Sequence, residues 1–273
     1  MANSLHSSMQ PLAKSSQVVN SAMRAFDVLE CIASAGRPLS VREVAKLCGT
    51  SRPTAYRYLV SLSMRGYVTS YKDDTYDLGS RLLTLGRNFL DRYDWISLVE
   101  PKLFDLGQIS GETVHIGLLD QSEMLYIAKV DSPQSIRMHS SLGTRNPVYC
   151  TAMGKAVLAF LDEPTRDTLL ASIELLPRTP NTITEQTQLY TELEHIKAKG
   201  YAIDDVENEA GVRCVSAPIH DFKGGVIGAI SISGPAYRLE ITKLRELAPT
   251  VMNVAQDISK LIGYVPNIAS KKG

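Results

Sequence analysis

The sequence lacks the patterns typical of metal, nucleotide and membrane proteins. No apolar run approaches the roughly 20 residues that cross a bilayer, so we expect no membrane partner. The four cysteines, at positions 31, 48, 150 and 214, include no CxxC pair, and the five histidines show no metal-ligand spacing. This argues against a zinc site, a disulfide framework and a bound cofactor, and it suits a reducing cytoplasm. There is no GxGxxG, and the Gly-Lys pair at 154–155 lacks the earlier glycine of a phosphate loop because Tyr149 takes that position.

Net charge is also lacking, but the positive charge is unevenly distributed. The 273 residues include 29 Lys or Arg and 29 Asp or Glu, so the chain is neutral. Residues 15–72 nevertheless hold eight Lys or Arg and only three Asp or Glu, a net +5. A length near 270 residues allows about two domains. The N-terminal part therefore has the charge that contacts to nucleic-acid phosphates require.

Residues 37–78 have the element order of a winged helix-turn-helix. Ser40 and Glu43 form a capping-box pair before a short amphipathic helix, with an apolar stripe at positions 41, 44, 45 and 47 that ends near Gly49. Ser51 can cap a second helix whose first turn contains Pro53. A short hairpin follows at 67–78. Such a module places its second helix in the DNA major groove, and double-stranded operator DNA is therefore the expected partner.

The predicted DNA-contacting residues follow from this arrangement. Ala55, Leu59 and Leu62 are expected to face the core, which leaves the remaining faces of the second helix for DNA. The second helix contributes one set of candidates, and phosphate contacts are expected from three basic residues outside it. These residues are Ser51, Arg52, Thr54, Arg57 and Tyr58 on the helix, with Arg24, Arg42 and Lys72 outside it.

The rest of the N-terminal half reads as a tail and two further helices. Residues 1–16 are rich in Ser, Ala and Gln without an apolar core, which is typical of a disordered tail and not of a signal peptide. A helix at 18–34 is expected to bury Ala22, Ala25, Phe26, Leu29 and Ile32. A linker helix at 79–93 has an apolar stripe that could cover either domain or a partner chain.

From residue 94 the pattern predicts an α+β domain around an antiparallel sheet. Strands are expected at 113–119, 124–130, 135–140, 201–204, 214–220 and 226–233, with turn residues between them. Helices are expected at 98–109, from 151, and at 163–176, 185–199 and 240–262. The predicted organisation is thus a tail (1–16), a winged helix-turn-helix domain (17–78), a linker helix (79–93), a ligand-binding domain (94–265) and a flexible tail (266–273).

Three segments of this domain can converge on a pocket for a small hydroxy- or keto-acid. The helix opened by Thr151 would offer the backbone N–H groups of Ala152, Met153 and Gly154 to a carboxylate. Asp204, Cys214, Ser231 and Ser233 lie on strands, and the two serines share a face because they are two residues apart. The alternative is that Thr151 is only an N-cap and that the serines are ordinary strand residues.

A catalytic interpretation is weaker. Cys214 is the candidate nucleophile, but His220 lies roughly 20 Å away along an extended strand and cannot be its base. We therefore predict that the chain is not an enzyme.

Several ordered motifs resemble one family. These are SRPTAYRYLVSLSMRGYV with a YDLG wing exit, then TAMGKAVLA, GYAIDDVENEAGVRCVSAPIHD and GGVIGAISISGP. They are similar to the IclR family of bacterial transcriptional regulators over residues 17–264. The resemblance implies a DNA-binding regulator with a GAF-like C-terminal domain that binds a small organic acid, and a dimer or tetramer whose N-terminal domains pair.

The resemblance also implies site residues. The backbone amides of Ala152 and Met153 would hold the carboxylate, with Asp204, Cys214, Ser231 and Ser233 around it. Met153 is bulkier than the small residue of some members, so a two- or three-carbon keto acid should not be assumed. The segment SIRMHSSLGTRNPVYCTAMGK resembles members that respond to sugar acids such as ketogluconates, with Arg137, His139 and Arg145 as further candidates. We expect a repressor of a catabolic operon; an activator, or an aromatic or short keto acid as effector, remains the alternative.

Overall fold

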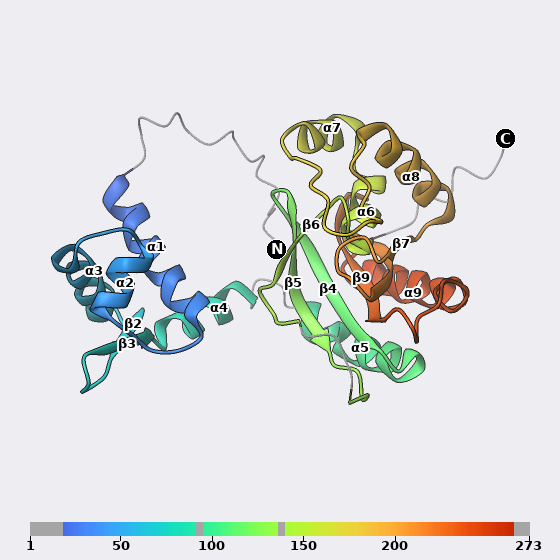
Figure 1. Cartoon of the computed structure of the whole chain (residues 1–273). Coiled ribbons are helices and arrows are strands. Elements are labelled where there is room, and N and C mark those ends of the chain that lie inside the picture. The colour runs from blue at the N-terminus through green and yellow to red at the C-terminus, as the bar shows by residue number, and fades with distance from the viewer. Residues whose placement is uncertain (1–18, 91–94, 136–139, 265–273) are drawn as a thin grey trace. The chain divides into compact units, whose positions relative to one another are not determined.

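The computed structural model describes residues 19–90, 95–135 and 140–264 (Figure 1). The chain divides into two compact units, residues 1–92 and 93–273, and each is described by itself. Within the described ranges no helix has the length and apolar character needed to cross a membrane.

The N-terminal unit is a winged helix-turn-helix. Its described elements are α1 (Asn20–Ala35), β1 (Leu39–Ser40), α2 (Val41–Leu47), α3 (Arg52–Met64), β2 (Val68–Ser70), β3 (Thr75–Leu78) and α4 (Arg81–Leu90). The three strands form an antiparallel sheet in the order β1-β3-β2, and β2 and β3 are the wing. The predicted module is confirmed.

The helix starts of this unit are encoded locally. The Ser40 hydroxyl accepts the backbone N–H of Glu43 at 3.4 Å, and the Glu43 carboxylate accepts the N–H of Ser40 at 2.9 Å, which completes the capping box. Ser51 accepts the N–H of Thr54 at 3.3 Å at the start of α3. These bonds satisfy backbone donors that the first turn of a helix leaves without partners. Both predicted caps are confirmed.

Two predicted apolar stripes are wrong in part. In α1 the buried residues are Val28 and Ile32, whereas Phe26 is 59% exposed and Ala22 is exposed too. In α2 the predicted stripe included Leu47, which is 63% exposed. Helical spacing shows which apolar residues share a face, but packing against α3 and β3 decides which face is buried. The apolar side chains that remain exposed are available to another surface.

The C-terminal unit is built on one six-stranded sheet. Its strands are β4 (Thr113–Asp120), β5 (Glu123–Val130), β6 (Arg145–Pro147), β7 (Ala202–Asp205), β8 (Val212–His220) and β9 (Val226–Pro235). Their order is β6-β5-β4-β9-β8-β7, and every neighbouring pair is antiparallel. The described helices are α5 (Trp95–Ser110), α6 (Ala152–Phe160), α7 (Glu163–Ala171), α8 (Gln186–Lys199) and α9 (Ile241–Leu261). The predicted α+β fold with an antiparallel sheet is confirmed.

Two local expectations differ from the structure. The helix predicted at 163–176 ends at Ala171, and the apolar residues Ile173 and Leu175 pack against the core from the segment that follows. The strand predicted at 135–140 falls mostly outside the described residues, and neither Ser135 nor Ser140 is in a strand. The third strand of this region is instead β6, which begins at Arg145.

The sheet separates two layers of helices (Figure 1). Residues of α5 and α9 form one apolar cluster with one face of β4, β8 and β9, and residues of α6, α7 and α8 form a second cluster. On β9, Ile230 and Ile232 belong to the first cluster. Because side chains alternate along a strand, Ser231 and Ser233 are on the opposite face, which α6 covers. The alternation thus places polar strand residues near the start of α6.

Candidate functional site

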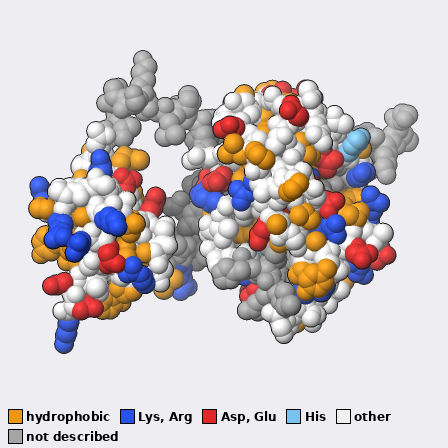
Figure 2. Space-filling model, viewed as in Figure 1, with side chains coloured by type: hydrophobic (Ala, Val, Ile, Leu, Met, Phe, Trp, Pro, Cys, Tyr) orange, Lys and Arg blue, Asp and Glu red, His pale blue; other side chains and the backbone are white. Residues whose placement is uncertain are grey.

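The first candidate surface is formed by α3 and the basic residues of the N-terminal unit. Among the predicted DNA-contacting residues, six are exposed: Ser51, Arg52, Arg57, Arg24, Arg42 and Lys72. Figure 2 shows several Lys and Arg side chains on the visible face of this unit. Thr54 is half-buried, and its Oγ1 lies 2.8 Å from the Ser51 hydroxyl.

Tyr58 differs from the expectation that it is free to meet DNA. It is half-buried and packs against the apolar core of the N-terminal unit. Tyr56, two positions earlier on α3, is 51% exposed. The two tyrosines lie on different sides of the helix because successive helical residues are rotated by about 100°. Tyr56 is therefore the aromatic residue of α3 that is open to a partner.

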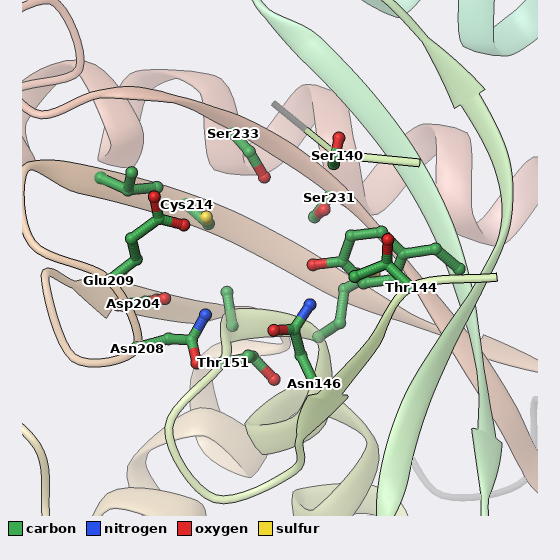
Figure 3. A pocket seen from close by; sticks show the side chains of 14 residues that line it. Ser140, Thr144, Asn146, Thr151, Asp204, Asn208, Glu209, Cys214, Ser231 and Ser233 are labelled. Carbon is green, nitrogen blue, oxygen red and sulfur yellow. The ribbon is translucent and has the colours of Figure 1, made fainter. Parts of the chain in front are cut away.

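The second candidate site is a pocket of about 90 Å³ in the C-terminal unit. Six of the predicted effector residues line it: Ala152, Met153, Asp204, Cys214, Ser231 and Ser233. The remaining lining residues are Tyr126, Ser140, Thr144, Asn146, Thr151, Asn208, Glu209 and Val212. Figure 3 shows the labelled side chains converging from the strands and the start of α6. Polar residues thus dominate the wall, and their binding role remains a prediction.

The N-terminus of α6 forms one wall of the pocket. Thr151 is the N-cap: its hydroxyl accepts the N–H of Gly154 at 3.1 Å and donates to the Pro147 carbonyl at 2.9 Å. Helix geometry gives the N–H groups of Ala152 and Met153 no partner inside the helix. With the positive end of the helix dipole, they can bind an anion.

Gly154 was predicted to contact the ligand, but the structure places it outside the pocket wall. Its N–H is already bonded to Thr151. A Cβ at this position would lie 2.2 Å from the Val148 carbonyl oxygen. Gly154 therefore allows α6 to approach the preceding backbone closely.

The strand register brings three predicted residues into one row. Asp204 on β7 pairs with Cys214 on β8, and Cys214 pairs with Ser233 on β9. Side chains of directly opposed residues lie on the same face, with Cβ atoms about 5 Å apart. The row therefore presents a carboxyl, a thiol and a hydroxyl to the same pocket.

Burial changes the ionisation of this row. Asp204 is 2% exposed, and burial, with the nearby charge of Glu207, raises its pKa to about 7. One Asp204 oxygen accepts the N–H of Glu207 at 2.6 Å. Desolvation also raises the pKa of the Cys214 thiol, so the thiol stays protonated at neutral pH. A protonated thiol is a poor nucleophile, which agrees with a binding site and not a catalytic one.

A buried ion pair lies behind the pocket. Lys155 on α6 is 1% exposed, and its Nζ lies 2.5 Å from an oxygen of Glu207 and 3.5 Å from one of Glu192 on α8. Burial raises the pKa of Glu207, and the charge of Lys155 opposes that shift. Lys155 thus neutralises a carboxylate in the loop that supplies Asn208 and Glu209 to the pocket.

The same loop is anchored from a second side. Val206 has φ +61°, a left-handed conformation that is unfavourable for a β-branched residue. Thr179 donates to the Val206 carbonyl at 2.5 Å, and Thr182 donates to the Glu207 carbonyl at 2.6 Å. Further bonds reach the carbonyls of Asp205 at 2.8 Å and Asn208 at 3.1 Å, from Asn181 and Arg178 respectively. These bonds hold the strained turn in place.

The remaining predicted residues do not join the described pocket. Arg137 and His139 lie outside the described residues. Arg145 is on β6, where its side chain pairs with Asp120 and Glu123 and is 44% exposed. Arg145 is not among the residues of the pocket wall.

Sequence reasoning missed the polar residues contributed by β5, by β6 and by the segment before β6. One of them, Tyr126, is far in sequence from the α6 motif. The others lie in the segment just before that motif: Ser140, Thr144 and Asn146. The available signal was a polar residue inside an apolar strand, as with His115 in TVHIGLL and Tyr126 in MLYIAKV. Such residues in a buried strand require a polar neighbour.

The comparisons with known proteins agree with this architecture. The model of the IclR helix-turn-helix domain matches residues 21–70, and that of the bacterial transcriptional regulator IclR C-terminal domain matches residues 87–260. The HTH-type transcriptional regulator KdgR of Escherichia coli (strain K12) is 33% identical over 254 residues, which cover 93% of this chain and 96% of that protein.

A second relative and a solved structure extend the match. The transcriptional repressor IclR of Escherichia coli (strain K12) is 31% identical and covers 90% of both chains. The crystal structure of the Thermotoga maritima IclR aligns with a TM-score of 0.77 at 39% identity, over 90% of this chain and 99% of that one. Both domains, in the same order and over nearly the full length, are therefore shared. The chain belongs to the IclR family of bacterial transcriptional regulators, which are not enzymes.

Proposed function

We propose that this protein represses a catabolic operon and that a small carboxylic acid of the sugar-acid class controls its affinity for operator DNA. The observation that supports a carboxylic acid as the ligand is that the α6 N-terminus, Asp204, Cys214 and Ser233 converge on one pocket. The helix start supplies backbone donors for a carboxylate, and the row supplies hydrogen-bonding groups for the rest of the molecule.

The polar wall favours a hydroxylated acid over an aromatic one. Ten of the lining residues have polar or ionisable side chains besides the tyrosine, and the apolar part consists of Ala152, Met153 and Val212. An aromatic ring would leave many of these groups without partners, which is costly in a buried site. An aromatic acid or a short keto acid is the alternative effector.

The DNA-binding role rests on α3 and its surroundings. Arg52 and Arg57 are exposed on α3 and are proposed to read base edges, with Arg24, Arg42 and Lys72 on phosphates. Repression is proposed because the similar IclR of Escherichia coli is a transcriptional repressor. Activation is the alternative sign.

A homodimer or homotetramer is proposed for the assembly. Val19 at the N-cap of α1 and Met23 and Phe26 within α1 are 63%, 52% and 59% exposed, and they recur at the spacing of one helical face. Leu83 and Leu85 on α4 are 77% and 44% exposed. Pairing of N-terminal units would bury these side chains. A dimer would place two α3 helices about one DNA turn, ~34 Å, or a multiple apart.

The test is fluorescence anisotropy of the full chain on its own upstream intergenic DNA at fixed salt. The acid panel contains 2-ketogluconate, D-gluconate, pyruvate and 4-hydroxybenzoate. We expect specific binding that a sugar acid weakens by about 5- to 150-fold, the range of typical allosteric couplings. Ser233→Ala should abolish the response and leave DNA binding unchanged, while Arg57→Ala should do the reverse.

The outcomes separate the parts of the proposal. Specific binding altered only by 4-hydroxybenzoate or pyruvate would replace the sugar acid and keep the regulator. Tighter binding with acid would favour the alternative in which the protein activates transcription. Absence of specific binding on this DNA at about 100 mM salt would contradict control of its own neighbouring genes.

A further inference from the structure

Two opposed residues of the sheet have buried polar atoms without partners. His115 on β4 pairs directly with Ser231 on β9, and each residue is 1% exposed. Among the described residues, neither Nδ1 of His115 nor Oγ of Ser231 has a hydrogen-bond partner. Buried polar atoms in native proteins nearly always have one, supplied by protein, water or ligand. Ser231 lines the pocket, whereas His115 is not part of its wall and lies directly opposite Ser231 on the neighbouring strand, so the two unpaired atoms mark this end of the pocket as a place for a polar ligand group.

His115 is held in one orientation by residues of the pocket wall. Its Nε2 lies 2.7 Å from the Ser140 hydroxyl, and its ring packs against the Tyr126 ring with centroids 4.7 Å apart. Burial, with the nearby charge of Lys129, lowers the pKa of His115 to about 3. The ring is therefore neutral, with one nitrogen that donates and one that accepts. A hydroxyl can satisfy either form because it both donates and accepts.

The surroundings of His115 differ from those of Asp204. Tyr126, Ser140, Thr144 and Asn146 line the pocket near this residue, and all four have uncharged polar side chains. Burial raises the pKa of Tyr126, and its interaction with the Asn146 side chain opposes that shift. Figure 3 shows Ser140, Ser231 and Thr144 on one side of the pocket and Asp204, Asn208 and Glu209 on the other. The pocket thus has an uncharged end and an acidic end.

We propose that Ser231, Tyr126 and Asn146, with His115 beside Ser231 on the neighbouring strand, form a hydroxyl-binding subsite that selects acids with hydroxyl groups along the chain beyond the carboxylate. This inference rests on the proposed function, because it assigns the specificity of the same pocket. A ligand hydroxyl in the pocket bonds to the Ser231 hydroxyl, which lies directly opposite His115 in the paired strands. A methylene in its place leaves the polar groups of Ser231, Tyr126 and Asn146 without a ligand partner, which is how a polar site rejects an analogue that lacks a hydroxyl.

The test is isothermal titration calorimetry of the full chain with D-gluconate and hexanoate. These acids share a carboxylate and chain length and differ in their hydroxyls. For the unchanged protein, gluconate should bind at least about 10-fold more tightly, as expected when a buried polar site is left unpaired. Tyr126→Phe removes one hydroxyl and should weaken gluconate binding by about 2- to 12-fold, the value of a neutral hydrogen bond, without changing hexanoate binding.

The matched control is Tyr190→Phe on α8. Its hydroxyl donates to Asp167 at 2.8 Å, and neither residue lines the pocket. The control should leave the gluconate-to-hexanoate ratio unchanged. His115→Phe, which keeps a ring against Tyr126, should lower the ratio further; if this variant does not fold, Tyr126→Phe decides alone.

Three results would overturn the subsite. These are equal affinities for the two acids, equal weakening of both by Tyr126→Phe, and binding of neither acid. If hexanoate binds as well as gluconate and still alters DNA affinity, the regulator stands and the subsite is wrong. Calorimetry needs no DNA, so a missing operator leaves this test intact.

Discussion

Replacing Lys155 by Met should destabilise the C-terminal unit through the carboxylate left behind. Lys155 is 1% exposed, and the Glu207 side chain with which it pairs at 2.5 Å is 8% exposed. Removing one partner of a buried ion pair costs about 3–5 kcal/mol, because the other charge remains buried without compensation. Glu192 is 32% exposed at 3.5 Å and adds little, since solvent screens it.

The assay is calorimetric unfolding of the full chain, which resolves the transition of each unit. For a domain of this size, 1 kcal/mol shifts Tm by about 2–4 °C, so the expected loss is about 6–20 °C. The double variant Lys155→Met/Glu207→Gln should recover most of it, because it removes the unpaired charge as well. An isosteric control without a buried partner is Lys197→Met, at an exposed position of α8.

The loss of stability in Lys155→Met should depend on pH, and the shifted pKa of Glu207 gives the direction of that dependence. Burial raises the pKa of Glu207 in the folded state, and removing Lys155 raises it further. A carboxyl with a raised folded-state pKa stabilises the fold when protonated and loses that contribution as pH rises through the folded-state pKa. The deficit of Lys155→Met should therefore be smaller at about pH 5 than at about pH 8. A loss below about 1 kcal/mol, equal at both pH values, would refute the argument that Lys155 neutralises a buried carboxylate.

Three further predictions concern the other sites. Gly154→Ala should lower Tm and weaken gluconate binding, because the new Cβ would lie 2.2 Å from the Val148 carbonyl; Gly86→Ala, with no atom within 4 Å, is the control that should keep both in thermal-shift assays. Arg57→Ala should weaken operator binding by about 1–3 kcal/mol if Arg57 contacts a base, and unchanged anisotropy at fixed salt would remove it from the interface. The pKa of Asp204 is raised to about 7, so carboxylate binding should weaken as pH rises through that value, while Asp204→Asn should show no such change; a pH-independent Kd in the unchanged protein would contradict the ionisation assigned to Asp204.

The signals that could be read from the sequence were short in range. Ser40 and Ser51 cap helices as predicted, and Thr151 caps α6, which was the alternative interpretation of that residue. Each cap depends on residues within three positions. The predictions of which apolar helix faces are buried were less accurate. Phe26 and Leu47 follow helical spacing and yet are exposed, since spacing does not say which neighbour a face will meet.

Some of the predicted pocket residues do lie together in the structure, and local sequence patterns explain which ones. Alternation along β9 already implied that Ser231 and Ser233 share a face, and the α6 motif implied backbone donors at Ala152 and Met153. Tyr126 was missed because it is distant from α6 in the chain, and Asn146 was missed because its position depends on the pairing of β6 with β5.

The sequence by itself determined the two kinds of domain, the helix caps, the strand alternation and the family. Only the tertiary structure decided that β4 lies beside β9, which opposes His115 to Ser231, and that Lys155 meets Glu207 across 52 positions of the chain. The physical reason is that strand order and the pairing of buried charges depend on packing of the whole sheet between its helix layers. Such contacts between distant residues have no periodic signature in the chain.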